Sequence, residues 1–246
     1  MTPPAAELRG VAQRFGRNVV LRSLDLTLEP GTLVGLVGAN GAGKTTLFAI
    51  LAGLLQPDAG ERRLFGVAAA DVSQELRARL AYVAHATQLY PGLSGRENLE
   101  LYADLRRACG LVSRAAEEVL TRLGLSREAQ GRPVGSYSRG MAQRVALARA
   151  LAASPDLLLL DEPFTALDAR GRAQLAEVLL AERARGAAIL LSSHDFDALV
   201  QICDRVVLLE RGGLAREARL GADGDRVAFR GRAAAVWQDV PVDAGE

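Results

Sequence analysis

The chain has 246 residues, of which 49% are hydrophobic, so it can form one large domain or two small ones around a substantial core. Its 30 Lys and Arg residues almost balance 29 Asp and Glu residues, and the net charge of +1 disfavours a main role in nucleic-acid binding. No apolar run approaches the ~18 residues that span a bilayer, and residues 1–10 lack the features of a signal peptide. We therefore expect a folded protein that neither crosses a membrane nor is exported.

Two residue types are used sparingly. Lys44 is the only lysine, and arginine fills every other basic position, so a chemical reason is expected for the lysine that is kept. Cys109 and Cys203 are far apart and show no metal-ligand spacing. We interpret both cysteines as small apolar fillers in a reduced protein.

The first sixty residues predict β structure that leads into a loop and a helix. Residues 8–14 and 19–28 alternate apolar and polar side chains, as half-buried antiparallel strands do. Residues 33–37 form a continuous apolar run, which is typical of a buried parallel strand. Residues 44–54 have helical spacing and end before a turn signal at 57–60.

The middle third, residues 73–152, is expected to be mostly helical. Ser94 and Glu97 have the spacing of a capping box and stand directly before an amphipathic run, so a helix is predicted to start near Ser94. Residues 112–123 and 141–151 predict two further amphipathic helices.

The last third returns to alternating strands and helices. Apolar runs at 157–160, 188–191 and 206–209 predict strands, with a helix over 169–185. This alternation predicts an α/β fold with a mostly parallel sheet, into which the helical middle is inserted. Residues 221–246, which contain the lone Trp237, are interpreted as a small appendage or a loose tail.

Residues 38–46 read Gly-Ala-Asn-Gly-Ala-Gly-Lys-Thr-Thr, which fits the phosphate-binding pattern G-x-x-x-x-G-K-[ST] between a predicted strand and a predicted helix. Glycines allow the backbone N–H groups to approach phosphate oxygens at a helix N-terminus. Lys44 supplies a compact charge for the β- and γ-phosphates, and the Thr45 hydroxyl suits Mg²⁺. A plain glycine-rich turn is the alternative, but it does not explain the single lysine. The predicted nucleotide-binding residues of this loop are Gly38, Asn40, Gly41, Gly43, Lys44, Thr45 and Thr46.

Two acids follow the apolar run at 157–160, at the carboxyl end of a predicted buried strand, where ligands of α/β sheets bind. Asp161 is predicted to hold Mg²⁺ together with Thr45, directly or through water. Glu162 is predicted to polarise the attacking water as general base, a role typically worth about 10²–10⁴-fold in rate. A chance acidic turn is the alternative interpretation.

With the residues that follow, these motifs resemble the ATP-binding subunit of an ABC transporter. Residues 137–141 resemble the signature loop and 142–151 its helix, 165–168 resemble the D-loop, and 193–195 the switch-histidine loop. The resemblance covers residues 8–214. It implies a P-loop NTPase (RecA-like) core with an N-terminal antiparallel β subdomain, an inserted α-helical subdomain at about 90–152, and an ATPase domain over 1–220.

The resemblance also implies further site residues. Ser138 and Gly140 are expected to bind the γ-phosphate of an ATP held by a second subunit, because two such chains sandwich two nucleotides head to tail as a homodimer or heterodimer. Asp168 belongs to the D-loop, and His194 is expected to contact the γ-phosphate and orient water. Phe15 is placed like the aromatic residue that stacks on adenine, although a strand phenylalanine is often a core residue.

The chain departs from the family pattern in two places. Tyr137, Arg139 and Met141 stand where Leu, Gly and Gln are commonest in the signature loop, a variation that occurs in exporter-type members. His85 stands where the family places a glutamine whose carbonyl oxygen binds magnesium, and a hard cation prefers oxygen to imidazole. Either His85 acts through water, or Gln88 takes the role, or the contact is weakened. We prefer His85, since it and residues 160–168 are similar to the haem-exporter ATPases of cytochrome c maturation.

The resemblance implies an ATPase that uses ATP and Mg²⁺ and drives a separate membrane permease, docked between Leu89 and Leu93, at the cytoplasmic face of the cell membrane. The signature loop favours an exporter, of the haem type or of the type that exports drugs or lipids. The alternative is a mechanical or regulatory ATPase that translocates nothing. An ordinary P-loop kinase has no use for the signature loop or for His194. No nucleic-acid partner is expected.

Overall fold

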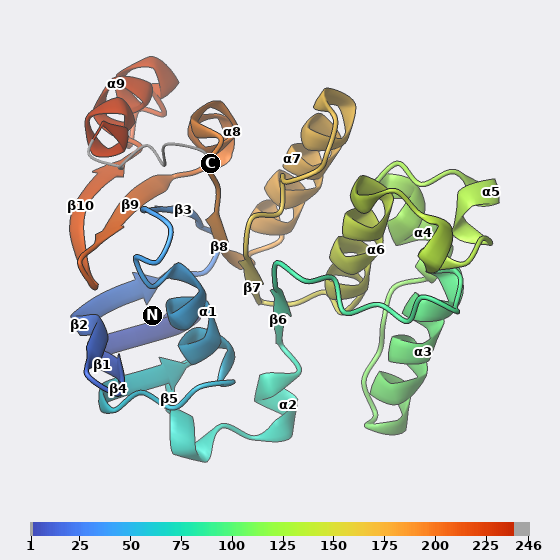
Figure 1. Cartoon of the computed structure of the whole chain (residues 1–246), viewed down its shortest axis with the longest axis horizontal. Coiled ribbons are helices and arrows are strands. Elements are labelled where there is room, and N and C mark those ends of the chain that lie inside the picture. The colour runs from blue at the N-terminus through green and yellow to red at the C-terminus, as the bar shows by residue number, and fades with distance from the viewer. Residues whose placement is uncertain (1, 239–246) are drawn as a thin grey trace.

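The computed structural model describes residues 2–238, which form two β-sheets and a set of helices (Figure 1). The strands are β1 (Ala6–Phe15), β2 (Asn18–Leu28), β3 (Leu33–Val37), β4 (Ala59–Leu64), β5 (Val67–Ala68), β6 (Leu80–Val83), β7 (Leu157–Leu160), β8 (Ala188–Ser192), β9 (Arg205–Glu210) and β10 (Gly213–Arg219). The α-helices are α1 (Lys44–Ala52), α2 (Gln74–Arg77), α3 (Gly95–Ala108), α4 (Ala116–Arg122), α5 (Arg127–Gln130), α6 (Arg139–Ala152), α7 (Ala169–Ala184), α8 (Phe196–Ile202) and α9 (Arg226–Trp237). Short 3-10 turns cover Ala69–Asp71 and Val134–Ser136.

The larger sheet has the strand order β10-β9-β3-β8-β7-β6. Its strands β3, β6, β7, β8 and β9 are parallel, and only the edge strand β10 is antiparallel to its neighbour. Every residue of β3, β7 and β8 is buried, as continuous apolar runs require in a sheet covered on both faces. The predicted α/β fold class is confirmed, and the carboxyl ends of the parallel strands meet at one edge.

The smaller sheet is antiparallel, with the order β2-β1-β4-β5. The alternating pattern of β1 and β2 buries one face of each strand. Helix α1 ends at Ala52, before the turn signal at 57–60 as predicted, and β4, which was not predicted, begins at Ala59 within that signal. Gly60 makes this possible: it has φ +89°, and a Cβ atom there would lie 2.5 Å from the backbone of Gly10 in β1.

Two hydrophobic cores lie on opposite faces of the larger sheet. In β7, Leu157 and Leu159 pack with α1 and the smaller sheet, whereas Leu158 and Leu160 pack with the helices of the other face. The alternation follows from the two-residue period of a strand. The sheet therefore packs against a hydrophobic core on each face, and this packing fixes the positions of the loops at its carboxyl edge.

The helices α3 to α6 form a separate group beside β6 and β7 (Figure 1). The capping box predicted at Ser94 is confirmed: its side chain accepts from Glu97 N, and Glu97 returns the hydrogen bond to Ser94 N. The helix predicted to start at 112 is wrong in its first turn, because α4 begins at Ala116. Residues 111–115 form a loop instead, in which Arg114 N bonds to the carbonyl of Ala152 at the end of α6. The strand β6 was missed because it lies within a segment interpreted as mostly helical, and only one of its four residues, Val83, is fully buried.

The segment after 221 is a packed appendage over its described part. Residues 226–237 form α9, whose Phe229, Ala233 and Val236 are buried against the sheet and α8. These residues are therefore not a loose tail. Residues 239–246 lie outside the described range. Among residues 2–238, no helix is both long and apolar enough to span a bilayer.

Candidate nucleotide-binding and hydrolysis site

The phosphate loop connects the buried strand β3 to α1. Helix α1 starts at Lys44 with Gly43 as N-cap, and no side chain caps it. The first backbone N–H groups of the helix, those of Lys44, Thr45 and Thr46, lie at its positive end, which suits an anion. Lys44 Nζ lies over the loop and donates to the carbonyls of Gly38 at 2.6 Å and Ala39 at 3.1 Å.

Glycine is required at two of the predicted loop positions for steric reasons. A Cβ atom on Gly38 would lie 2.5 Å from the carbonyl oxygen of Leu209, so the loop passes directly over β9. Gly43 has φ +106°, and a Cβ atom there would meet Val20 and Leu21 of β2 at about 3.0–3.2 Å. Asn40 and Gly41 are exposed. The glycines thus allow the loop to pass close to both β9 of the larger sheet and β2 of the smaller sheet.

Asp161 and Thr45 meet, as predicted, at the carboxyl edge of the sheet. Thr45 Oγ1 donates to Asp161 Oδ2 at 3.2 Å, although the two residues are 116 positions apart. Ser192, the fully buried last residue of β8, donates to Asp161 Oδ1 at 2.7 Å. Its hydroxyl also accepts from Glu162 N at 2.9 Å. Ser192 was not predicted to belong to the site, and it fixes both acids at once.

Glu162 is held by its backbone and by His194. It has φ +54°, an uncommon conformation for a residue with a side chain, and such strain is found mainly at functional sites. His194 N donates to Glu162 Oε2 at 3.3 Å, and His194 Nε2 lies 3.2 Å from Glu162 Oε1. The structure thus brings the two predicted catalytic residues together.

The Glu162 carboxyl group has spare hydrogen-bonding capacity. Its Oε1 is buried and, within the described chain, makes no hydrogen bond of good geometry beside the His194 contact. Burial raises the pKa of Glu162 above its usual value, although His194 and Lys44 act in the opposite direction. A buried carboxylate oxygen without a donor fits an attacking water, which would satisfy it and lose a proton to it.

The donor set also fits Mg²⁺. This ion typically takes one or two protein oxygens and fills its octahedron with water and substrate phosphate oxygens. Thr45 Oγ1 and Asp161 Oδ2 supply such oxygens side by side at the start of α1. Within residues 2–238, no three His, Cys, Asp or Glu side chains gather as a protein-only metal site. A magnesium ion here would therefore depend on bound phosphates.

The residues predicted for the signature loop and the D-loop make contacts within this chain. Ser138 is the N-cap of α6, and its hydroxyl accepts from Met141 N at 3.3 Å. A Cβ atom on Gly140 would lie 2.4 Å from the carbonyl oxygen of Ala166, so the first turn of α6 contacts the loop before α7. Asp168 caps α7, and the N–H of Gly171 and the Arg144 guanidinium hold its pKa below the usual value.

The two departures from the family pattern touch each other. Arg139 Nη2 and His85 Nε2 lie 3.2 Å apart. Arginine can only donate, so His85 Nε2 must accept and its proton must lie on Nδ1. The ring lone pair is then occupied by Arg139. In this arrangement His85 offers an N–H rather than the ligand oxygen of a glutamine.

Phe15 ends β1 and is 54% exposed, so it is not a core residue. A hollow of about 400 Å³ lies between the β1–β2 hairpin and the phosphate loop, but Phe15 does not line it. The hollow is lined by Asn18, Val19, Val20, Arg22, Gly41, Ala42, Arg211 and Gly212. The predicted stacking of adenine on Phe15 stays a prediction.

A signal for Ser192 was present in the sequence. It is the first polar residue after the apolar run 188–191, and parallel strands end at the same edge. The contact between Arg139 and His85 left no such signal, because the residues are 54 positions apart and both are exposed.

Comparisons with known proteins agree on one family. A family model described as ABC transporter matches residues 21–165. A daunorubicin resistance ATP-binding protein of Streptomyces coeruleorubidus is 35% identical, over 92% of this chain and 73% of that protein. An aliphatic sulfonates import ATP-binding protein of Xanthomonas axonopodis is 39% identical, over 89% and 87%. An uncharacterized ABC transporter ATP-binding protein of Nostoc is also 39% identical, and the chain spans 58% of its length.

Solved structures show the same fold. The ATP-binding subunit of an ABC transporter has a TM-score of 0.79 at 29% identity, covering 96% of this chain and 98% of that one. A dimeric ATP-binding cassette in a post-hydrolysis state, bound to ADP and Pi, has a TM-score of 0.76 at 25% identity, covering 88% and 99%.

Proposed function

The chain belongs to the family of ABC transporter ATP-binding subunits, and from this premise we propose that it hydrolyses ATP to drive a separate membrane permease. The observation that carries the proposal is the arrangement of Glu162. Within residues 2–238 its buried Oε1 receives no hydrogen bond of good geometry beside the His194 contact, while Ser192 and His194 fix the rest of the residue. The group is positioned to take a proton.

In the proposed reaction, the N–H groups at the start of α1 and the Lys44 ammonium bind the β- and γ-phosphates. Thr45 and Asp161 would hold Mg²⁺, which neutralises charge on the phosphates. Glu162 orients a water molecule and accepts its proton, and His194 orients Glu162 and faces the γ-phosphate. The rate enhancement then comes from positioning and charge.

Ser138 and Gly140 are proposed to complete the site of a second subunit. Both residues are at the start of α6, where a hydroxyl and free N–H groups suit an anion. Dimerisation on ATP binding, in a homodimer or heterodimer, would bring this loop to the γ-phosphate of the partner. The dimeric form of a similar cassette supports this arrangement.

The loop between Leu89 and Leu93 is proposed as the permease contact. It is fixed from within by Asn98, which is fully buried, accepts from Tyr90 N at 2.9 Å and donates to Tyr90 O at 3.1 Å. The Tyr90 side chain remains 52% exposed. Arg149 of α6 donates to the carbonyl of Gln88 just before it at 2.7 Å. A force on this loop would therefore reach α6 and its first residues.

Export is the direction we propose, with the protein at the cytoplasmic face of the membrane. Support comes from the signature loop and from the daunorubicin resistance relative, whereas the sulfonate import relative is an importer by name. Neither name concerns cytochrome c maturation, so the haem-exporter assignment rests on His85 and residues 160–168 alone. An exporter of drugs or lipids is the broader form of the proposal.

One experiment tests ATP-driven dimerisation. Light scattering on Glu162→Gln with MgATP should detect a dimer that is absent without nucleotide. Ser138→Ala in this background should weaken association about tenfold or more, because a hydrogen bond to a charged phosphate is lost. Ser136→Ala is the matched control, because this exposed serine bonds only to its own turn. Failure of Glu162→Gln to associate with MgATP would contradict the homodimer and leave only a heterodimer with a different ATP-binding subunit.

A second experiment identifies the partner. The tagged chain is purified from its native membranes in mild detergent, its companions are identified, and a visible spectrum is recorded. A colourless multi-span permease supports the broader exporter. Haem absorbance together with cytochrome-maturation proteins supports the haem type. Stimulation of ATP hydrolysis by DNA or ribosomes, without a membrane partner, supports the mechanical alternative.

A further inference from the structure

The C-terminal helix α9 lies against α8, which begins two residues after His194 (Figure 1). Its buried face consists of Phe229, Ala233 and Val236. Asp225 caps the helix by accepting from the N–H groups of Val227 and Ala228. These features are sufficient to anchor the helix to the core.

A second stripe of α9 reaches α8 itself. Arg226, Arg230 and Trp237 share one side of the helix, because they are spaced at four and seven residues. Arg226 donates to the carbonyls of Val200 and Cys203 at the end of α8. Arg230 and Trp237 contact its beginning. This stripe adjoins the buried face that anchors the helix, and Trp237 packs against the same core.

The contacts at the beginning of α8 are aromatic and ionic. The ring centroids of Trp237 and Phe196 are 5.2 Å apart at an interplanar angle of 57°. The Arg230 guanidinium carbon lies 5.3 Å from the Phe196 ring centroid, and its Nη2 donates to Asp197 Oδ1 at 2.6 Å. Two successive residues of α8, Phe196 and Asp197, thus contact two residues of α9, Arg230 and Trp237.

Phe196 and Asp197 are directly connected to the hydrolysis site. With Glu162 and His194 they line the same cavity of about 420 Å³. Asp195, between His194 and Phe196, accepts from Ala198 N at 3.0 Å as the cap of α8 and from Arg172 Nη1 at 2.7 Å. A shift of the first turn of α8 would therefore move the His194 backbone, whose N–H bonds to Glu162.

We propose that α9 positions the His194 loop, with Trp237 and Arg230 as positioning residues that act through Phe196 and Asp197. The inference rests on the proposed function, because it assigns α9 to the same hydrolysis site. It gives a role to the only tryptophan of the chain. Nucleotide binding at Glu162 and His194 should then change the environment of the Trp237 side chain.

The lone tryptophan provides the first test. Fluorescence of the full chain is followed with selective tryptophan excitation while MgATP or a non-hydrolysable ATP analogue is added. We expect the emission of Trp237 to change with nucleotide, and Phe196→Leu to remove most of that change. Val227→Ala is the matched control, since Val227 is on α9 but is 83% exposed and should leave the response intact.

Kinetics provides the second test. Trp237→Ala and Arg230→Ala should each lower kcat for ATP about three- to tenfold, which lies within the range of coupling between contacting residues, with KM nearly unchanged. Trp237→Phe should restore most of kcat, because it keeps an aromatic ring against Phe196. Circular dichroism and thermal unfolding verify that each variant is folded.

The outcomes separate this inference from the proposed function. Wild-type hydrolysis with no nucleotide response at Trp237, and with unchanged kcat in Trp237→Ala and Arg230→Ala, would overturn the role of α9 and leave the ATPase assignment intact. Absence of hydrolysis in the wild type would contradict the proposed function, while the fluorescence titration would still test the coupling through nucleotide binding. A wild type that binds no nucleotide would overturn both.

Discussion

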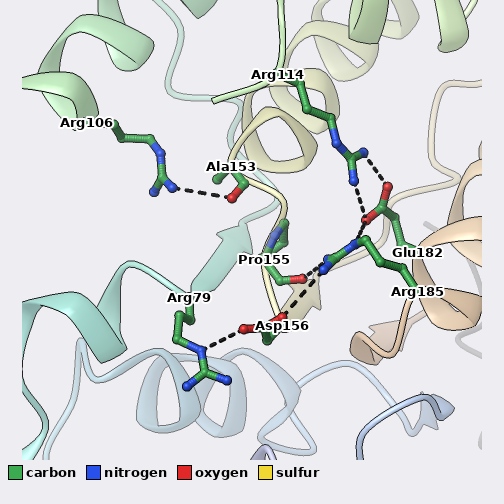
Figure 2. Close-up of polar contacts among 8 residues, drawn as sticks. All are labelled: Arg79, Arg106, Arg114, Ala153, Pro155, Asp156, Glu182 and Arg185. Atoms are coloured by element: carbon green, nitrogen blue, oxygen red, sulfur yellow. Dashed lines mark hydrogen bonds and ion pairs between the residues drawn. The ribbon is translucent and has the colours of Figure 1, made fainter. Parts of the chain in front are cut away.

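Glu182 and Glu162 are both largely buried carboxylates, one near the amino ends of the strands of the six-stranded sheet and the other at their carboxyl ends. Figure 2 shows Glu182 between Arg114 and Arg185. Arg114 donates to both of its oxygens, with Nη2 3.1 Å from Oε2, and Arg185 Nε lies 2.9 Å from Oε2. The carboxylate of Glu162, by contrast, has a buried oxygen that receives no hydrogen bond of good geometry from the described part of the chain.

The pKa values of the two groups are displaced in opposite directions. Burial acts to raise the pKa of Glu182, but hydrogen bonds from Arg114 and Arg185 outweigh it and the pKa lies below its usual value. At Glu162 burial prevails and the pKa is raised. A fully bonded buried carboxylate stabilises the fold, whereas a partly bonded one keeps the capacity to accept a proton.

The Glu182 cluster joins the segment between α3 and α4 to α7 and to the start of β7 (Figure 2). Arg114 comes from the loop before α4, and Glu182 from α7. Arg185 continues to Asp156 at the start of β7, and Arg79 Nε bonds to the same aspartate at 2.6 Å. Arg106 of α3 donates to the carbonyl of Ala153 after α6 at 3.3 Å. All partners in this cluster are charged or backbone groups already in use, which is typical of a structural network.

The largest expected effect comes from removing the Glu182 carboxylate, and it is on the stability of the fold. Glu182→Ala should lower the free energy of unfolding by about 3–5 kcal/mol, because it leaves two arginines near a buried site without their carboxylate. Denaturant unfolding followed by circular dichroism measures the loss. Turnover per folded molecule should change little, and a large loss of turnover with unchanged stability would reverse the roles assigned to the two glutamates.

His194→Ala removes the side chain that holds Glu162. Turnover should fall about 100-fold, the lower end for a group in general acid–base catalysis. The pKa of Glu162 should rise further, since His194 lowers it, so the acid limb of the pH–rate profile should move to higher pH. Steady-state kinetics across pH measures both effects. An acid limb that stays in place would separate His194 from the ionisation of Glu162.

The pair His85 and Arg139 should have a smaller effect. His85→Gln restores a ligand oxygen, so the Mg²⁺ concentration for half-maximal turnover should fall a few-fold, as expected for one oxygen ligand gained. Arg139→Gly alone removes the contact, and a double-mutant cycle should give a coupling of about 0.5–1.5 kcal/mol, the range of one hydrogen bond. Strict additivity would show that the two side chains act independently.

The smallest effect concerns acid stability. The pKa of Glu182 is lowered in the folded protein, so its contribution to stability is present above the unfolded value of about 4.3 and is lost as pH falls through the folded value. Unfolding midpoints measured below about pH 5 should therefore fall less steeply with acid in Glu182→Gln than in the wild type. Parallel slopes in the two proteins would contradict the assigned pKa direction.

The elements that carry the site could be predicted where the signal is local. The phosphate loop, β3 and β7 were found because a few consecutive residues hold the whole pattern. The missed strand β6 is mostly half-buried and lacks the continuous apolar run of β7, and β4 starts inside a turn signal, so neither had a strand pattern of its own. The first turn predicted for α4 is absent, because tertiary contacts of Arg114 hold that segment as a loop.

The contacts that distinguish the two glutamates could not be predicted from the sequence. Arg114 and Glu182 are 68 positions apart, and Glu162 and Ser192 are 30 apart. In the sequence, both glutamates stand next to apolar residues, and this local pattern does not distinguish them. Only the fold shows which carboxylate receives two arginines and which faces a cavity.

The central claim, that Glu162 takes a proton from water during ATP hydrolysis, is tested most directly by a single-turnover measurement on Glu162→Gln. The account predicts that ATP binds as in the wild type while the hydrolysis step slows about 10²–10⁴-fold. It also predicts unchanged or higher thermal stability, because the raised pKa means that the fold opposes ionisation of this group at neutral pH. Hydrolysis at the wild-type rate in this variant would contradict the account.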